Sequence, residues 1–126
     1  MKTTLATNTT IVTVTFNSMA VLPGMLASIP IGTPIIIVDN NSTDIAAVKK
    51  ISKNFEAKLI INKINKGFPE ACNQGAKLAK TKFVFFLNPD TTIEKDTIIN
   101  LENSARANPK VGAMNPKILE PSGKQY

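Results

Sequence analysis

The chain has 126 residues, of which 43% are apolar, and its mean hydropathy is close to zero. This length and composition predict one globular domain. Its longest unbroken apolar stretch is about five residues, too short to span a bilayer, and the polar start Met1–Asn8 lacks the apolar segment of a signal peptide. The absence of histidine excludes His-based catalysis and His-ligated metals, and the single cysteine excludes an internal disulfide and suits a reducing cytoplasm.

The net charge is +6, from 15 basic and 9 acidic side chains. Such a charge suits an anionic partner, for example a nucleotide, a phosphorylated lipid headgroup or a nucleic acid. The lysines are scattered and the aromatic residues form no stacking array, so the sequence favours no nucleic-acid partner. A solvated, lysine-rich surface is the simplest explanation.

The first half of the chain predicts alternating strands and helices. Thr9–Phe16 alternates threonine with apolar residues and predicts a strand, and about 18–28 predicts a short helix. A second strand is expected over Ile35–Val38, and the helix that follows, about 44–54, begins at a turn and N-cap cluster, Asn40–Asp44.

The second half continues the same alternation. The expected elements are a strand at Lys58–Ile61, a loop at 62–69, a helix rich in small residues from about Ala71, a strand at Phe83–Leu87, a helix at about 95–108, and a fifth strand at Val111–Met114. This order predicts an α/β fold with a parallel sheet covered by helices on both faces.

Polar residues follow three of the predicted strands. If the first strands are ordered 3-2-1-4, then Asn17, Asp39 and Asp90 line one crevice beyond the carboxyl ends of the strands, where open α/β sheets bind ligands. Asp39 could accept hydrogen bonds from ribose hydroxyls or a base N–H, or could only form a turn. Asp90 could hold Mg²⁺ or Mn²⁺, or could serve an Asx-turn or helix cap. Pro89 restricts Asn88 and directs this turn.

The segment Asn65-Lys66-Gly67-Phe68 is a third signal. Gly67 permits positive φ or close backbone approach, and Lys63 and Lys66 could reach a phosphate. The same residues are equally compatible with an ordinary turn. Cys72, on the face with the small residues and without a histidine to activate it, is expected to be inert packing.

Together these motifs resemble the nucleotide-binding half of the family 2 glycosyltransferases, and most closely the rhamnosyltransferase-like members. The resemblance covers about residues 10–124 and is carried by Val12–Asn17, Ile37–Asp44, Asn65–Phe68 with Asn73 and Gly75, Phe86–Asp90, and Val111–Lys117. Phe86–Asp90 is similar to a Leu-Asn-Pro-Asp form of the family's Asp-x-Asp metal motif. Each motif alone is weak, but five in the right order are specific.

The resemblance implies a GT-A (Rossmann-like) α/β fold, mostly parallel and incomplete at its C-terminal side. It implies that residues 1–126 are a single nucleotide-sugar-binding domain of a longer glycosyltransferase, because family members continue into an acceptor-binding half that supplies the catalytic base. No carboxylate of this chain matches that base.

The implied reaction is an inverting, metal-assisted transfer of a sugar from a dTDP-, UDP- or GDP-sugar to a saccharide or lipid-linked hydroxyl acceptor, in cell-envelope polysaccharide biosynthesis. The implied location is cytoplasmic, with peripheral association at the inner face of the membrane. The residues that match donor-binding positions are Phe16, Asn17, Asp39, Asn41, Asn65, Lys66, Gly67, Asn73 and Asn88, and Asp90 matches the ligand for Mg²⁺ or Mn²⁺.

Other functions stay open at this point. A non-catalytic nucleotide-sugar-binding module fits the missing base. A nucleotidyltransferase would need a basic, glycine-rich loop after the first strand, but 17–26 has one glycine, Gly24, and no lysine or arginine; a dinucleotide-binding oxidoreductase fails for the same reason. An open sheet edge and uncovered apolar surface would favour a homo-oligomer.

Overall fold

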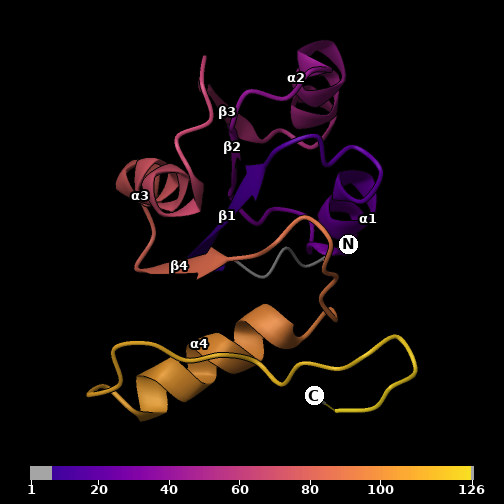
Figure 1. Cartoon of the computed structure of the whole chain (residues 1–126). Coiled ribbons are helices and arrows are strands. Elements are labelled where there is room, and N and C mark those ends of the chain that lie inside the picture. The colour runs from indigo at the N-terminus through magenta and orange to yellow at the C-terminus, as the bar shows by residue number, and fades with distance from the viewer. Residues whose placement is uncertain (1–6, 126) are drawn as a thin grey trace. The chain divides into compact units, whose positions relative to one another are not determined.

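The computed structural model describes residues 7–125 (Figure 1). Its elements, in chain order, are β1 (Thr9–Thr15), α1 (Leu22–Ser28), β2 (Ile35–Asp39), α2 (Ile45–Asn54), β3 (Lys58–Ile61), α3 (Phe68–Leu78), β4 (Phe83–Phe86) and α4 (Thr97–Ala107). The described chain forms two compact units, one up to Lys95 and one from Asp96, and each is described by itself.

The first unit contains a four-stranded sheet in the order β3-β2-β1-β4, with every neighbouring pair parallel. The predicted strand order is therefore confirmed. The register pairs Thr15 with Asp39 and Asp39 with Ile61, so the carboxyl ends of β1, β2 and β3 lie level with one another. Loops that follow these strands consequently meet at the same edge of the sheet.

Helices cover both faces of the sheet: α3 lies on one face, and α1 and α2 lie on the other (Figure 1). Side chains alternate between the faces along each strand. The α3 face carries a cluster that includes Val12, Ile36, Val38 and Ala71. Buried β-branched residues on adjacent strands explain both the strand propensity and the continuous core.

The close approach of α3 to the sheet depends on a glycine. A Cβ atom at Gly75 would lie inside van der Waals contact with Val12 Cγ1 and 3.3 Å from Val38 Cγ2. The expectation that a small-residue helix packs closely on the sheet is therefore confirmed at this position.

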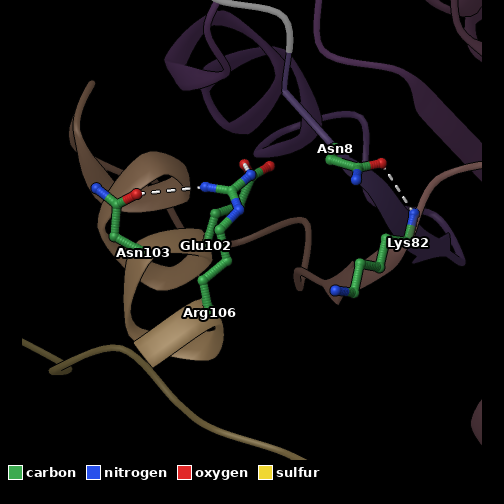
Figure 2. A network of polar contacts seen from close by, with 5 residues as sticks. All are labelled: Asn8, Lys82, Glu102, Asn103 and Arg106. Carbon is green, nitrogen blue, oxygen red and sulfur yellow. Dashed lines mark hydrogen bonds and ion pairs between the residues drawn. The ribbon is translucent and has the colours of Figure 1, made fainter. Parts of the chain in front are cut away.

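Hydrogen bonds join the beginnings of β1 and β4. The backbone N–H of Lys82 donates to Asn8 Oδ1 at 3.0 Å (Figure 2), and the N–H of Phe83 donates to the Asn8 carbonyl oxygen at 3.0 Å. Thr10 and Thr81 share a hydroxyl hydrogen bond of 2.6 Å. These contacts fix where β4 starts along β1.

The second unit consists of α4 and the segment after it. On α4, Arg106 Nη2 lies 2.9 Å from Glu102 Oε2, and Arg106 Nη1 donates to Asn103 Oδ1 at 3.3 Å (Figure 2). The prediction of a strand at Val111–Met114 is wrong, because no strand forms there and both Val111 and Met114 are exposed. Pro109 and Pro116 flank this short segment and restrict its backbone and hydrogen bonding.

Over residues 7–125, none of the helices is long and apolar enough to cross a membrane.

Candidate functional site

A surface pocket of about 390 Å³ lies beyond the carboxyl ends of β1, β2 and β4. This volume falls within the range of about 300–1,000 Å³ that is usual for small-molecule sites. The residues that line it come from the ends of these strands, from the loops that follow them, and from the loop after β3 with the start of α3: Val14, Phe16, Ser18, Val21, Asn40, Asn65, Phe68, Asn88, Pro89 and Asp90. Four predicted site residues (Phe16, Asn65, Asn88 and Asp90) therefore meet in one pocket.

Asp90 reaches the pocket through a tight turn after β4. The carbonyl oxygen of Asn88 accepts from the Thr91 N–H at 3.1 Å and from Thr91 Oγ1 at 2.7 Å. This bond closes a turn with Pro89 and Asp90 at its centre, in the positions that suit proline and aspartate. The Asp90 side chain is exposed and lines the pocket, as a ligand for an ion from solution must be.

Asp39 lies at the same end of the sheet, but its carboxylate is not part of the pocket lining. The residue is fully buried, and its carboxylate accepts hydrogen bonds from Thr15 Oγ1 at 3.0 Å, from the Ser42 N–H at 2.9 Å and from Ser42 Oγ at 2.5 Å. Alternation along β2 places Asp39 on the face of Ile35 and Ile37, opposite the α3 face. The carboxylate of Asp39 therefore holds the loop after β2, and its direct contact to the nucleoside stays a prediction.

Asn17 supports the same loop. Its φ of 52° lies in the left-handed region, its N–H donates to Ser42 Oγ at 2.9 Å, and its Oδ1 accepts from the Thr43 N–H at 2.9 Å. Asn41 also has positive φ, at 74°, and its side chain is exposed. Neither asparagine lines the pocket. The loop ends at Asp44, which caps α2 by accepting from the Ala47 N–H, as the turn and N-cap prediction requires.

The third signal, Asn65–Phe68, contributes its first and last residues, Asn65 and Phe68, to the lining of the pocket. Asn65 Oδ1 accepts from the Gly67 N–H at 2.9 Å, and Gly67 has a φ of 80° immediately before α3. The glycine is therefore needed for its backbone conformation. Lys66 is exposed next to the pocket, whereas Asn73 is exposed on α3 and does not line it.

Three amide side chains at this site were missed by sequence reasoning: Asn40, Asn62 and Gln74. Asn40 Nδ2 donates to the Gly67 carbonyl oxygen at 3.1 Å, and Asn62 Nδ2 donates to Asn40 Oδ1 at 3.0 Å. Asn62 and Gln74 exchange two hydrogen bonds, of 2.8 and 3.0 Å. Alternation along β2 was the available signal, because it places Asn40 on the face of Ile36 and Val38, where the pocket lies.

The pocket residues fit a divalent ion only if a ligand supplies further oxygens. Asp90 is the one acidic side chain among the described residues that line the pocket, and residues 7–125 hold no cluster of three or more acidic or thiol side chains placed for a metal. Mg²⁺ is commonly held by one or two carboxylates together with substrate phosphates. Asp90 with a diphosphate satisfies that pattern.

The parallel sheet, the helices on its two faces and the pocket at the carboxyl ends of the strands define a GT-A (Rossmann-like) α/β fold. Residues 10–122 match the family described as Glycosyl transferase family 2. The chain belongs to this family, as the resemblance in its motifs indicated.

Relatives and solved structures are consistent with this assignment. The chain is 34% identical over 92 residues to the poly-beta-1,6-N-acetyl-D-glucosamine synthase of Staphylococcus epidermidis, covering 70% of this chain and 22% of that protein. It therefore spans about a fifth of the length of such relatives.

Two solved structures share the fold. One is S. aureus TarS residues 1–349, with a TM-score of 0.67, 25% identity, and coverage of 79% of this chain and 32% of that one. The other is the mannosyltransferase PcManGT of Pyrobaculum calidifontis in complex with GDP-Man and Mn²⁺, with a TM-score of 0.79, 22% identity, and coverage of 94% and 37%.

Proposed function

We propose that this chain supplies the donor-binding part of a glycosyltransferase, which transfers a sugar from a nucleoside-diphosphate sugar to an acceptor hydroxyl with inversion. The observation that carries the proposal is the pocket itself. In a chain of the glycosyltransferase family 2, it brings an exposed aromatic ring, amide side chains and one carboxylate together beyond the carboxyl ends of parallel strands.

The nucleoside is assigned to the side of the pocket formed by Phe16. Its ring is 51% exposed although it directly follows a buried strand, so it offers a flat apolar surface. A nucleobase stacked on an aromatic ring gains about 1–3 kcal/mol. Asp39 supports this side of the pocket indirectly. Its carboxylate is bonded to Thr15 and Ser42, and these bonds fix the start of the loop, where Asn40 lies.

The diphosphate is assigned to the space between Asp90 and the Asn65–Gly67 segment. Asp90 and Asn88 would hold a divalent ion, Mg²⁺ or Mn²⁺, together with phosphate oxygens. When bound, the ion neutralises charge on the departing diphosphate. Lys66 and the exposed Lys63 add positive charge on the other side. A PcManGT complex with GDP-Man and Mn²⁺ shares this fold and supports the assignment.

A binding module without transfer activity is the second candidate for this chain alone. Inverting transfer needs a general base to take the proton of the acceptor hydroxyl. Over the described residues of the pocket, Asp90 is the only carboxylate, and it is assigned to the metal. A transfer assay on the 126-residue chain tests this second candidate, because transfer to an acceptor would show that the chain itself contains a base.

The test of donor binding is calorimetry with UDP-, dTDP- and GDP-sugars in the presence of Mn²⁺. We expect one of them to bind, and Phe16→Ala to weaken its binding by about 5- to 150-fold, the range that corresponds to the stacking energy. Phe86→Ala is the matched control, because Phe86 is similarly exposed, at 47%, but does not line the pocket. Equal losses in the two variants would contradict the assignment of Phe16, and no binding by any of the sugars would contradict the proposal.

A further inference from the structure

We propose that Asn40 is a positioning residue for donor binding: its buried side-chain amide, supported by Asn62 and Gln74, closes the loop 62–67 and holds Asn65 and Lys66 at the pocket. The inference rests on the proposed function for the nucleotide, while the clamp itself rests on contacts within the chain.

Asn40 is placed where its amide meets both ends of the loop. It directly follows β2 and is 2% exposed, and its N–H donates to the Thr15 carbonyl oxygen at 2.8 Å. At the far end of the loop, Asn40 Oδ1 accepts from the Lys66 N–H at 3.2 Å and Asn40 Nδ2 donates to the Gly67 carbonyl oxygen at 3.1 Å. One side chain therefore binds a donor and an acceptor of consecutive residues.

The near end of the loop is fixed by Asn62. Its backbone N–H donates to the Asp39 carbonyl oxygen at 2.9 Å, which extends the pairing of β2 with β3 by one residue. Its side-chain Nδ2 donates to Asn40 Oδ1 at 3.0 Å. Both ends of the loop thus converge on the same oxygen atom of Asn40.

Gln74 anchors this arrangement to α3. Gln74 Nε2 donates to Asn62 Oδ1 at 3.0 Å, and Gln74 Oε1 accepts from Asn62 Nδ2 at 2.8 Å. Because each amide donates to the other, neither can rotate without losing a bond. Networks of this kind rigidify a site when their members are satisfied.

The residues between the two anchors depend on this clamp for their position. Lys63, Ile64, Asn65 and Lys66 are all exposed, so little packing of their own side chains fixes them. Asn65 nevertheless lines the pocket. A loop ordered before the ligand arrives lowers the entropic cost of binding, so loosening the clamp weakens donor affinity. Asn40 itself lines the pocket and Gln74 does not, so Gln74→Ala loosens the clamp without removing a pocket side chain.

The test measures two quantities in each variant: amide hydrogen exchange of Lys66 without nucleotide, and affinity for the nucleoside diphosphate that the wild type binds best among UDP, dTDP and GDP, with Mn²⁺. For Asn40→Ala we expect at least tenfold faster exchange and at least fivefold weaker binding. Gln74→Ala, at a half-buried helical position that tolerates alanine, should change both in the same direction by less, and it tests the inference if Asn40→Ala does not fold.

Ser52→Ala is the matched control, because Ser52 is also buried, at 3% exposure, and its hydroxyl donates to the Val48 carbonyl oxygen far from the pocket. It should leave exchange of Lys66 and nucleotide affinity unchanged. In the double variant Asn40→Ala/Gln74→Ala, the loss of affinity should be smaller than the product of the two single losses, because both act on one loop.

The outcomes separate the inference from the proposed function. If the wild type binds nucleotide and Asn40→Ala binds it equally well, the positioning role is overturned and the proposed function stands. Weaker binding with unchanged exchange of Lys66 also overturns the inference, because Asn40 would then act by direct contact. A wild type that binds none of the three nucleotides would overturn the proposed function, and with it any role of the clamp in donor binding.

Discussion

Replacement of Gly75 by alanine tests how closely α3 must approach the sheet. Two effects oppose each other. Alanine favours a helix over glycine by about 0.8–1.0 kcal/mol. Against this, the new methyl group would overlap Val12 Cγ1 and crowd Val38 Cγ2, and an extra methyl in a packed core costs about 1–3 kcal/mol.

The surroundings of Gly75 decide which effect is larger. Val12 is 1% exposed and Val38 is fully buried, so neither side chain has space to move aside. Both are β-branched, and their χ1 rotation is restricted. We therefore expect Gly75→Ala to lower the free energy of unfolding by about 1–2 kcal/mol, which corresponds to a fall in Tm of about 4 °C or more.

Gly24→Ala provides the control for helix propensity. Gly24 lies in α1, and a Cβ atom there would meet no atom within 4 Å. We expect this variant to be as stable as the wild type or more stable by about 0.5 kcal/mol. The assay is thermal and urea unfolding of the wild type and both variants. If Gly75→Ala is as stable as Gly24→Ala, the close packing of α3 on β1 and β2 is refuted.

Other substitutions test separate parts of the structure. Glu56 has a φ of 53° just after α2, where the Ala57 N–H donates to the Ser52 carbonyl oxygen. Glycine adopts this left-handed conformation without strain, so Glu56→Gly should raise the free energy of unfolding by about 1 kcal/mol in urea. A loss of stability would contradict this. Asp39→Ala leaves buried hydrogen-bond donors without a partner and should lower the free energy of unfolding by about 3 kcal/mol in the same assay. A loss below about 1 kcal/mol would mean that the carboxylate does not hold the loop. Burial raises the pKa of the Cys72 thiol, so its alkylation by iodoacetamide should reach half its maximal rate at a higher pH than a free cysteine, and a lower midpoint would be inconsistent with desolvation.

Most of the fold could be predicted from the sequence because apolar periodicity and turn residues agree along the first 95 residues. The strand at Lys58–Ile61 has the predicted bounds, and the observed strand order is the one on which the predicted crevice was conditional. The predicted helix at about 18–28 begins later, at Leu22, immediately before Pro23. The strand predicted at Val111–Met114 does not form, because a short apolar run becomes a strand only when a neighbouring strand pairs with it.

The candidate site was predicted less completely than the fold. The strand ends predicted a shared crevice, and four of the predicted residues, Phe16, Asn65, Asn88 and Asp90, line one pocket there. Which side chain of a consecutive pair lines the pocket depends on strand register and on the alternation of side chains along the strand, and of the pair Asp39 and Asn40 it is Asn40. Asn62 and Gln74 gave no signal of their own, because an amide pair 12 residues apart is recognised only once α3 has packed on the sheet.

The most direct test of the central claim is the Mn²⁺-dependent part of nucleotide affinity, measured by calorimetry for the wild type, Asp90→Asn and Glu94→Gln. Both variants remove one exposed negative charge, but only Asp90 lines the pocket. We predict that Mn²⁺ strengthens nucleotide binding by the wild type and by Glu94→Gln at least tenfold and has no effect on Asp90→Asn. An unchanged Mn²⁺ effect in Asp90→Asn would contradict a metal-assisted donor site at this pocket.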